Sequence, residues 1–267
     1  MNNSSVINSL YNIRLLEEAA EGHSYVHRVH PLIKLVTTVI YLVTVVSFGR
    51  YETGRLLPFL FYPVIIFALA ELPVLPILKR ILMVEPLILG IGILNPVFDR
   101  HILLFAGTEI PGGWIAFLSI IIKCSLTVAA ALLLIATTGM GRLASALRML
   151  KVPRVFVLQL LLTYRYISVL TEEVGRILKA YSLRAPRQKG VQPAAWGPLA
   201  GQLLLRTFDR AQRVYQAMCL RGFAGEYHTG RNRKPGIGDF IYMLVWGSVF
   251  ILTRIYDIPL IIGSLIV

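Results

Sequence analysis

Five long stretches of this chain consist almost entirely of apolar residues. They cover residues 32–48, 56–72, 81–94, 114–138 and 240–256. Each approaches the ~20 residues that an α-helix needs to cross a bilayer, although the third is short unless Lys79 and Arg80 snorkel. Hydrophobic residues make up 56% of the chain, above the ~45–50% typical of soluble domains. The sequence therefore predicts an all-α integral membrane protein with about five transmembrane helices. Residues 101–106 and 258–267 are apolar but too short to cross, and we expect re-entrant or interfacial pieces there.

One contiguous segment carries the whole positive charge of the chain. The formal net charge is +13, and residues 139–235 contain 17 Lys and Arg against 4 Asp and Glu, whereas the remainder is neutral. Nucleic-acid binding is one interpretation of such a segment. In a membrane protein the commoner interpretation is cytoplasmic exposure with contact to anionic lipid headgroups. The segment is therefore predicted to be a cytoplasmic domain.

This charge also orients the remaining loops. With residues 139–235 inside, the fourth run crosses inward and the third crosses outward, which places Lys79 and Arg80 inside. The predicted organisation is a cytoplasmic N-terminal segment (1–30), transmembrane helices 1–4 (31–138), the basic domain (139–235), and a last transmembrane helix with its tail (236–267). The N-terminus is then inside and the C-terminus outside. The polar start of the chain does not resemble a cleavable signal peptide.

Three ionisable residues fall within or beside the apolar runs. Lys34 is close enough to the cytoplasmic face to snorkel. Glu85 and Lys123 lie deeper and a pair between them is conceivable, although their estimated depths match poorly. For Glu85, contact with a partner helix is favoured over an ion site.

The basic segment has the pattern of two long helices. Residues 154–184 contain no proline, residues 186–198 contain three prolines and two glycines and are expected to form a loop, and residues 199–221 form a second helix. Two stripes at spacings of three and four run along the second helix. One is apolar (Leu204, Phe208, Ala211, Tyr215, Met218) and the other is mostly basic (Arg206, Arg210, Arg213, Ala217, Arg221).

The two predicted helices end with the same pattern. R-x-x-x-A-x-x-L-R-small occurs at residues 176–185 and again at 213–222. Ala180 and Ala217 lie four residues before Arg184 and Arg221, on the same helix face. Each arginine follows a leucine (Leu183, Leu220) and precedes a small residue (Ala185, Gly222), and Gly222 is a natural helix stop. A guanidinium at an exposed helix end can bind a carboxylate through two hydrogen bonds. Two such helix ends therefore suggest two docking points for a partner. The alternative is that two Arg-rich helices share this pattern by chance.

These residues resemble the coupling motifs of the transmembrane (T) component of energy-coupling-factor (ECF) transporters. The segment 215–225 is similar to the second motif, and residues 30–35 and 152–173 are similar to the family's first-helix signature and to the run before its first coupling helix. The segment 213–218 is most similar to the cobalt/nickel, CbiQ-type branch of the family. The resemblance implies that Arg184 and Arg221 each dock in one ATPase subunit. Leu183 and Leu220 depart from the family, which more often has alanine there.

The resemblance also implies the partners. These are two ABC ATPase subunits (two copies or a pair), a substrate-binding membrane subunit of the CbiM or S-component type, and lipid, in the plasma membrane of a prokaryote. The chain itself is expected to be non-catalytic and to bind no cofactor, with ATP and Mg²⁺ held by the ATPases. It contains no G-x-x-x-x-G-K-[ST]. His23, His27 and His30 would align on a helix, but their context argues against a metal site.

Three other functions remain open at this stage. A T component can serve vitamin-type substrate subunits instead of metal-type ones. An intramembrane enzyme would need acidic or histidine residues facing a cavity, for which only Glu85 is available. A basic membrane anchor for lipid or nucleic acid would explain the charge but not the repeated helix ends.

Overall fold

The computed structural model describes residues 20–22, 24–72, 74–98, 102–105, 108–186, 188, 190–225 and 235–256. The described chain forms two units, each considered by itself. Residues 20–139 and 235–256 form a helical unit, which we call the bundle. Residues 140–225 form a second helical unit, which we call the arm. Both are helical, as the sequence predicts, apart from one short β-hairpin in the bundle.

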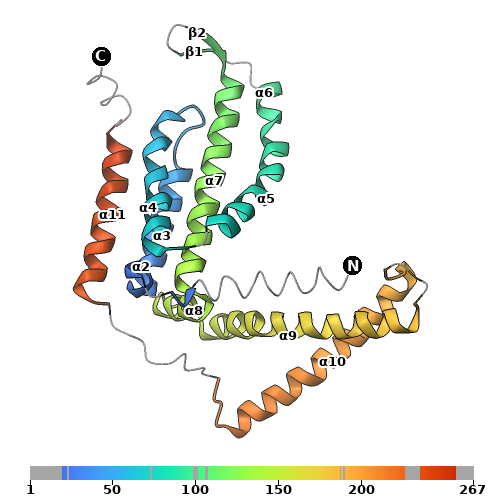
Figure 1. Ribbon diagram of the computed structural model, residues 1–267. Helices are drawn as coiled ribbons and strands as arrows, with labels where there is room; N and C mark the ends of the chain where they lie inside the picture. Colours follow the sequence, from blue (N-terminus) through green and yellow to red (C-terminus); the bar gives the residue numbers. More distant parts are fainter. Residues whose placement is uncertain are drawn as a thin grey trace. The chain divides into compact units, whose positions relative to one another are not determined.

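The bundle contains the five apolar runs, each within helical structure. Its elements in chain order are α2 (Tyr25–Arg28), α3 (Pro31–Val46), the 3₁₀ helix η1 (Gly54–Leu60), α4 (Phe61–Ala70), α5 (Val74–Gly92), α6 (Leu94–Phe98), β1 (Ile102–Phe105), β2 (Thr108–Pro111), α7 (Gly112–Thr138) and α11 (Ile237–Ile255). α7 packs against α3, α4, α5 and α6, and α11 packs against α3 and η1 (Figure 1).

Two expectations for the bundle are corrected in detail. The third run belongs to a longer helix, because α5 begins at Val74 and continues through Pro86. Part of the expected re-entrant piece at 101–106 is strand β1, which pairs antiparallel with β2 from Ile102↔Pro111 to Phe105↔Thr108. The expected piece at 258–267 lies outside the described residues.

A cluster of aromatic side chains forms the core between α3, η1, α4 and α11. The Tyr41 ring lies 4.6 Å from that of Tyr62 and 5.3 Å from that of Phe250, measured between ring centroids. The Tyr41 hydroxyl donates a hydrogen bond of 3.0 Å to the carbonyl of Phe59, so its polar end is satisfied inside the core. These contacts fix α11, which is distant in sequence, against the first helices.

A buried polar cluster joins one end of α3 to α7 and α11. Asp239, only 5% exposed, accepts hydrogen bonds from the backbone N–H of His30 (2.9 Å) and of Gly236 (2.8 Å). One carboxylate therefore caps the starts of α3 and α11 together. Lys34 is 3% exposed and donates to the Thr137 carbonyl at 2.9 Å. The prediction that Lys34 snorkels is wrong, because the last turn of α7 supplies a buried acceptor.

The conceivable Glu85–Lys123 pair is not formed. Lys123 donates to the carbonyls of Phe48 (2.7 Å) and Gly49 (3.1 Å), just beyond the end of α3. Glu85 accepts a hydrogen bond from Ser125. The two side chains therefore serve different helix contacts.

The arm consists of α8 (Met140–Met149), α9 (Arg154–Arg184) and α10 (Pro193–Leu220). α10 begins six residues earlier than the sequence suggests, so the expected loop at 186–198 is shorter. Proline is compatible with this start, because Pro193 occupies the first helical position, where its missing N–H has no intrahelical partner. Pro198 lies inside α10.

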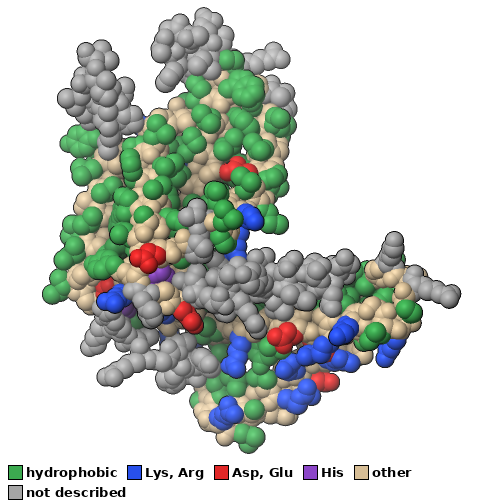
Figure 2. Space-filling model, viewed as in Figure 1, with side chains coloured by type: hydrophobic (Ala, Val, Ile, Leu, Met, Phe, Trp, Pro, Cys, Tyr) green, Lys and Arg blue, Asp and Glu red, His purple; other side chains and the backbone are tan. Residues whose placement is uncertain are grey.

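The surfaces of the two units differ in chemistry. Figure 2 shows hydrophobic side chains over much of the visible face of the bundle and Lys and Arg side chains gathered on the arm. Among the described helices, α7, α9 and α11 are long and apolar enough to cross a membrane. α9 is the least apolar of the three even in its most apolar part, and its second half carries charged residues. The exposed apolar surface of the bundle suits lipid contact.

Candidate functional site

The first predicted docking residue, Arg184, is the last residue of α9. The following chain folds back on this end: the Ala185 N–H donates to the Tyr181 carbonyl (3.1 Å) and the Tyr181 hydroxyl donates to Gln188 Oε1 (3.0 Å). Arg184 itself is exposed. A cation at this position also complements the negative end of the helix dipole.

The second predicted docking residue, Arg221, sits at a differently built helix end. The Phe223 N–H donates to the Met218 carbonyl and the Gly222 N–H to the Cys219 carbonyl, both at 3.0 Å. These two bonds, with Gly222 at φ +81°, are those of a Schellman motif. The helix stop predicted at Gly222 is confirmed, and the backbone around Arg221 is held in one conformation. The two ends share their sequence pattern but not their capping.

Replacing Gly222 with alanine should loosen this end of α10. A positive φ costs an L-residue about 1–2 kcal/mol, so hydrogen–deuterium exchange at residues 218–223 should become faster in Gly222→Ala. Gly201→Ala is the matched control, because Gly201 lies inside α10 with open space around an added Cβ and alanine favours a helix there. Unchanged protection at residues 218–223 would show that Gly222 does not hold this helix end.

Each predicted docking arginine lies beside an exposed leucine. Leu183 is 74% exposed and Leu220 is 90% exposed. The resembled family more often has alanine at these positions, so leucine adds an apolar side chain next to the cation. Such a pair offers both burial of apolar area and a charge-assisted hydrogen bond to a protein partner. Ala180 and Ala217 lie on the same helices and are also exposed.

An ion pair that sequence reasoning missed connects the two long helices of the arm. Glu173 on α9 accepts from Arg176 at 2.5 Å and from Arg206 of α10 at 2.6 Å. The hydrogen bonds from Arg176 and then Arg206 hold the pKa of the Glu173 carboxyl below its ordinary range. Glu173 is 33 residues from Arg206, so no local pattern predicts the pair. Arg206, interpreted from sequence as one member of a charged stripe, instead has a structural contact.

The two candidate docking ends are not brought together. α9 ends at Arg184, and α10 begins at Pro193 and ends at Leu220, so Arg184 and Arg221 mark opposite ends of α10. The 28 residues of α10 correspond to about 42 Å at ~1.5 Å per residue. Two separate contacts, not one joint site, follow from this arrangement.

The apolar stripe predicted on α10 is present but is not buried within the described chain. Leu204, Phe208 and Tyr215 are all exposed, and α10 has no fully buried residue. This face therefore suits a lipid or protein partner.

The histidines have local structural contacts. His27 Nδ1 lies 2.7 Å from the Ser24 hydroxyl, and His30 Nδ1 accepts from the Leu32 N–H at the start of α3. His23 lies outside the described residues, and α2 ends at Arg28, so one helix does not align the three. Within the described residues, no group of three or more metal-ligating side chains occurs.

Comparison with known proteins is consistent with these features. The CbiQ family, described as "Cobalt transport protein", matches residues 22–231. The energy-coupling factor transporter transmembrane protein EcfT of Bacillus subtilis is 27% identical over 80% of this chain and 86% of its own length. An uncharacterised protein of Methanocaldococcus jannaschii is 26% identical over 84% of this chain and 80% of its own length. The nickel permease LarQ of Lactiplantibacillus plantarum is 27% identical over 51% of this chain and 53% of its own length.

The family match covers most of the chain and includes the arm and four of the five apolar runs. The chain therefore belongs to the CbiQ family and is a transmembrane component of an ECF-type transporter. The sequence-based resemblance to this family is confirmed.

Proposed function

We propose that this chain couples ATP hydrolysis by partner ATPase subunits to import through a partner substrate-binding membrane subunit. The bundle sits in the plasma membrane with the N-terminus inside and the C-terminus outside. The arm lies on the cytoplasmic side, because loops rich in Lys and Arg are favoured there. ATP is also available on that side. The ATPases, as two copies or a pair, bind ATP and Mg²⁺, and this chain transmits force between them and the substrate subunit.

The observation that carries this proposal is the pair of helix ends. Each places an arginine beside a highly exposed leucine at the C-terminus of a long helix. Within the described residues, neither Arg184 nor Arg221 forms a hydrogen bond or ion pair through its side chain. At each helix end, a cation and an apolar side chain are exposed together. This favours a role in docking a partner over a role in folding.

The proposed substrate is cobalt or nickel ion. The family description names cobalt transport, and the name of the LarQ relative names nickel. The metal is bound by a CbiM-type partner and not by this chain, whose described histidines make local contacts. Import of a vitamin through another substrate subunit is the alternative that the test below separates.

Reconstitution with the partners tests the proposal. This chain, co-expressed with its ATPase and substrate-binding subunits, should support ATP-dependent uptake of Co²⁺ or Ni²⁺, and omission of this chain should abolish uptake. Replacement of His23, His27 and His30 together should leave uptake largely intact. Uptake of a vitamin but of neither metal would overturn the substrate assignment, and failure of any ATPase to co-purify would overturn the coupling role.

A further inference from the structure

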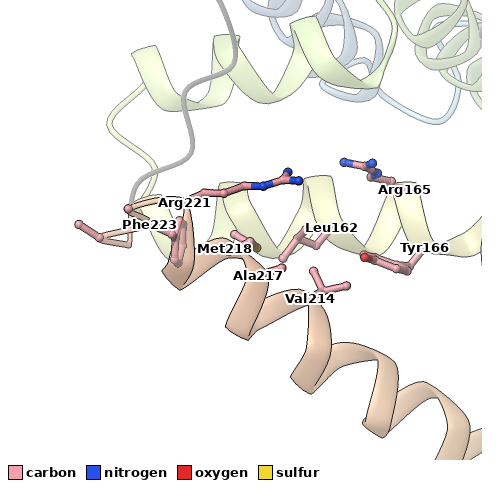
Figure 3. A pocket seen from close by; sticks show the side chains of 10 residues that line it. Leu162, Arg165, Tyr166, Val214, Ala217, Met218, Arg221 and Phe223 are labelled. Atoms are coloured by element: carbon pink, nitrogen blue, oxygen red, sulfur yellow. The ribbon is translucent and has the colours of Figure 1, made fainter.

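A cleft of about 620 Å³ opens within the arm, between the first half of α9 and the C-terminal end of α10. Its apolar lining includes Leu162 of α9 and Val214, Met218 and Phe223 of α10 and the turn after it. Figure 3 shows these side chains between the two helices, with Arg165 of α9 and Arg221, just after α10, along one side. The cleft is therefore apolar inside and cationic at one edge.

The two arginines point toward one another in Figure 3, although both carry positive charge. Neither side chain forms a hydrogen bond or ion pair with another described residue. Farther along the same two helices, Arg176 and Arg206 also approach each other, and there the chain supplies Glu173 between them. Among the residues that the structure describes, no acidic side chain lines the Arg165–Arg221 cleft. Two like charges facing one open cleft favour an anion between them.

The shape of the cleft favours an acidic protein side chain as this anion. Two planar guanidinium groups match a carboxylate, and the Tyr166 ring and the apolar lining suit a neighbouring hydrophobic side chain. Ala217 and Gly222 leave room for a backbone to approach. The Schellman motif at Met218–Phe223 fixes one wall, so binding requires little further ordering.

Resting on the proposed docking of Arg221, we infer that Arg165 is a further ATPase-binding residue at the same docking point. The cleft then receives an acidic side chain of the ATPase flanked by an apolar residue. The cleft is continuous with the proposed interface, because Arg221 belongs to both. The docking point at Arg221 is then a binding cleft formed by α9 and α10 together. Arg165 binds the partner directly, and α9 contributes to both docking points.

The test measures affinity for the co-expressed ATPase with the full chain in neutral-lipid nanodiscs. Arg165→Glu should weaken binding by about tenfold or more, as expected for reversal of a charge in a partly buried contact. Arg210→Glu is the matched control, because Arg210 is exposed on α10 and does not line the cleft. Arg165→Gln, which removes the charge without repulsion, should have a smaller effect of the same sign.

A double-mutant cycle makes the inference specific. If Arg165 and Arg221 hold the same carboxylate, the variant that combines Arg165→Gln with Arg221→Gln should be much less impaired than the product of the two single effects, because glutamine removes each charge without adding repulsion. The effects of Arg165→Gln and Arg184→Gln on affinity should instead multiply, because these residues serve different docking points. If the effects of the Arg165 and Arg221 changes on affinity simply multiply, the two residues do not hold one carboxylate, and the inference is overturned.

The outcomes separate this inference from the proposed function. If Arg221→Glu weakens binding and Arg165→Glu behaves like Arg210→Glu, the inference fails and the docking of Arg221 stands. If neither variant weakens binding, the docking of Arg221 fails, and the inference fails with it. If Arg165→Glu has an effect only in nanodiscs containing anionic lipid, the cleft is a lipid-headgroup site and the inference is wrong.

Discussion

The double variant Arg184→Glu, Arg221→Glu is expected to lose uptake completely while inserting into the membrane normally. The two residues lie at the ends of α9 and α10, so the variant reverses the charge at both proposed docking points. Loss of one partner from a buried charged contact costs about 2–5 kcal/mol, and repulsion by the new carboxylate adds to this. Uptake assays and co-purification of the ATPase measure the result.

The control for this variant must change the net charge equally. Arg210→Glu with Lys151→Glu does so at exposed positions outside both repeats of the helix-end pattern. We expect the control to retain most uptake. Arg206 is unsuitable as a control, since its ion pair with Glu173 holds α9 to α10. Equal loss in both double variants would mean that the charge density of the arm matters and that its ends have no special role. Arg221→Lys should give an intermediate loss, because an ammonium lacks the planar fork.

Asp239→Ala is expected to cause the largest loss of stability in the bundle. It leaves the N–H groups of His30 and Gly236 without their carboxylate acceptor. An unsatisfied buried group costs about 1–3 kcal/mol. The His30 N–H is buried and the Gly236 N–H is part-buried, so the two together should lower the free energy of unfolding by about 2–6 kcal/mol. Thermal unfolding of the detergent-solubilised chain measures the change.

Two controls accompany this stability test. Asp239→Asn keeps one acceptor oxygen and should be less damaging than Asp239→Ala. Asp209→Ala removes an exposed carboxylate from α10 and should leave the transition nearly unchanged. If Asp239→Ala unfolds at the same temperature as the unaltered chain, the carboxylate does not hold α3 and α11 together.

Features that depend on neighbouring residues were predictable from the sequence. Each of the five apolar runs falls in helical structure, because hydropathy over such a length leaves few alternatives to a helix. The stop at Gly222 follows from the backbone freedom of glycine after an apolar stripe. The start of α10 is not predictable in the same way, because Pro193 and Pro198 are both typical of loops, although proline is also compatible with a first helical turn.

Features that depend on distant contacts were not predictable. Burial of Lys34 requires the Thr137 carbonyl, 103 residues away. Lys123 binds carbonyls just after α3, which no spacing within its own helix reveals. Likewise, no spacing along α9 distinguishes Arg165 from the other basic residues of the arm, and only the fold places it beside Arg221. The helix-end arginines themselves remain a prediction that needs a partner to test it.

The most direct test of that prediction is site-specific photo-crosslinking in the assembled transporter. A photoreactive amino acid at Leu183 or Leu220, the exposed neighbours of the docking arginines, should crosslink to the ATPase in good yield. The same probe at Leu244, an exposed position of α11, should not. Crosslinks from both helix ends to the ATPase are the predicted result. Probes at Leu183 and Leu220 that capture only lipid, in a complex that retains its ATPase, would contradict docking through these helix ends.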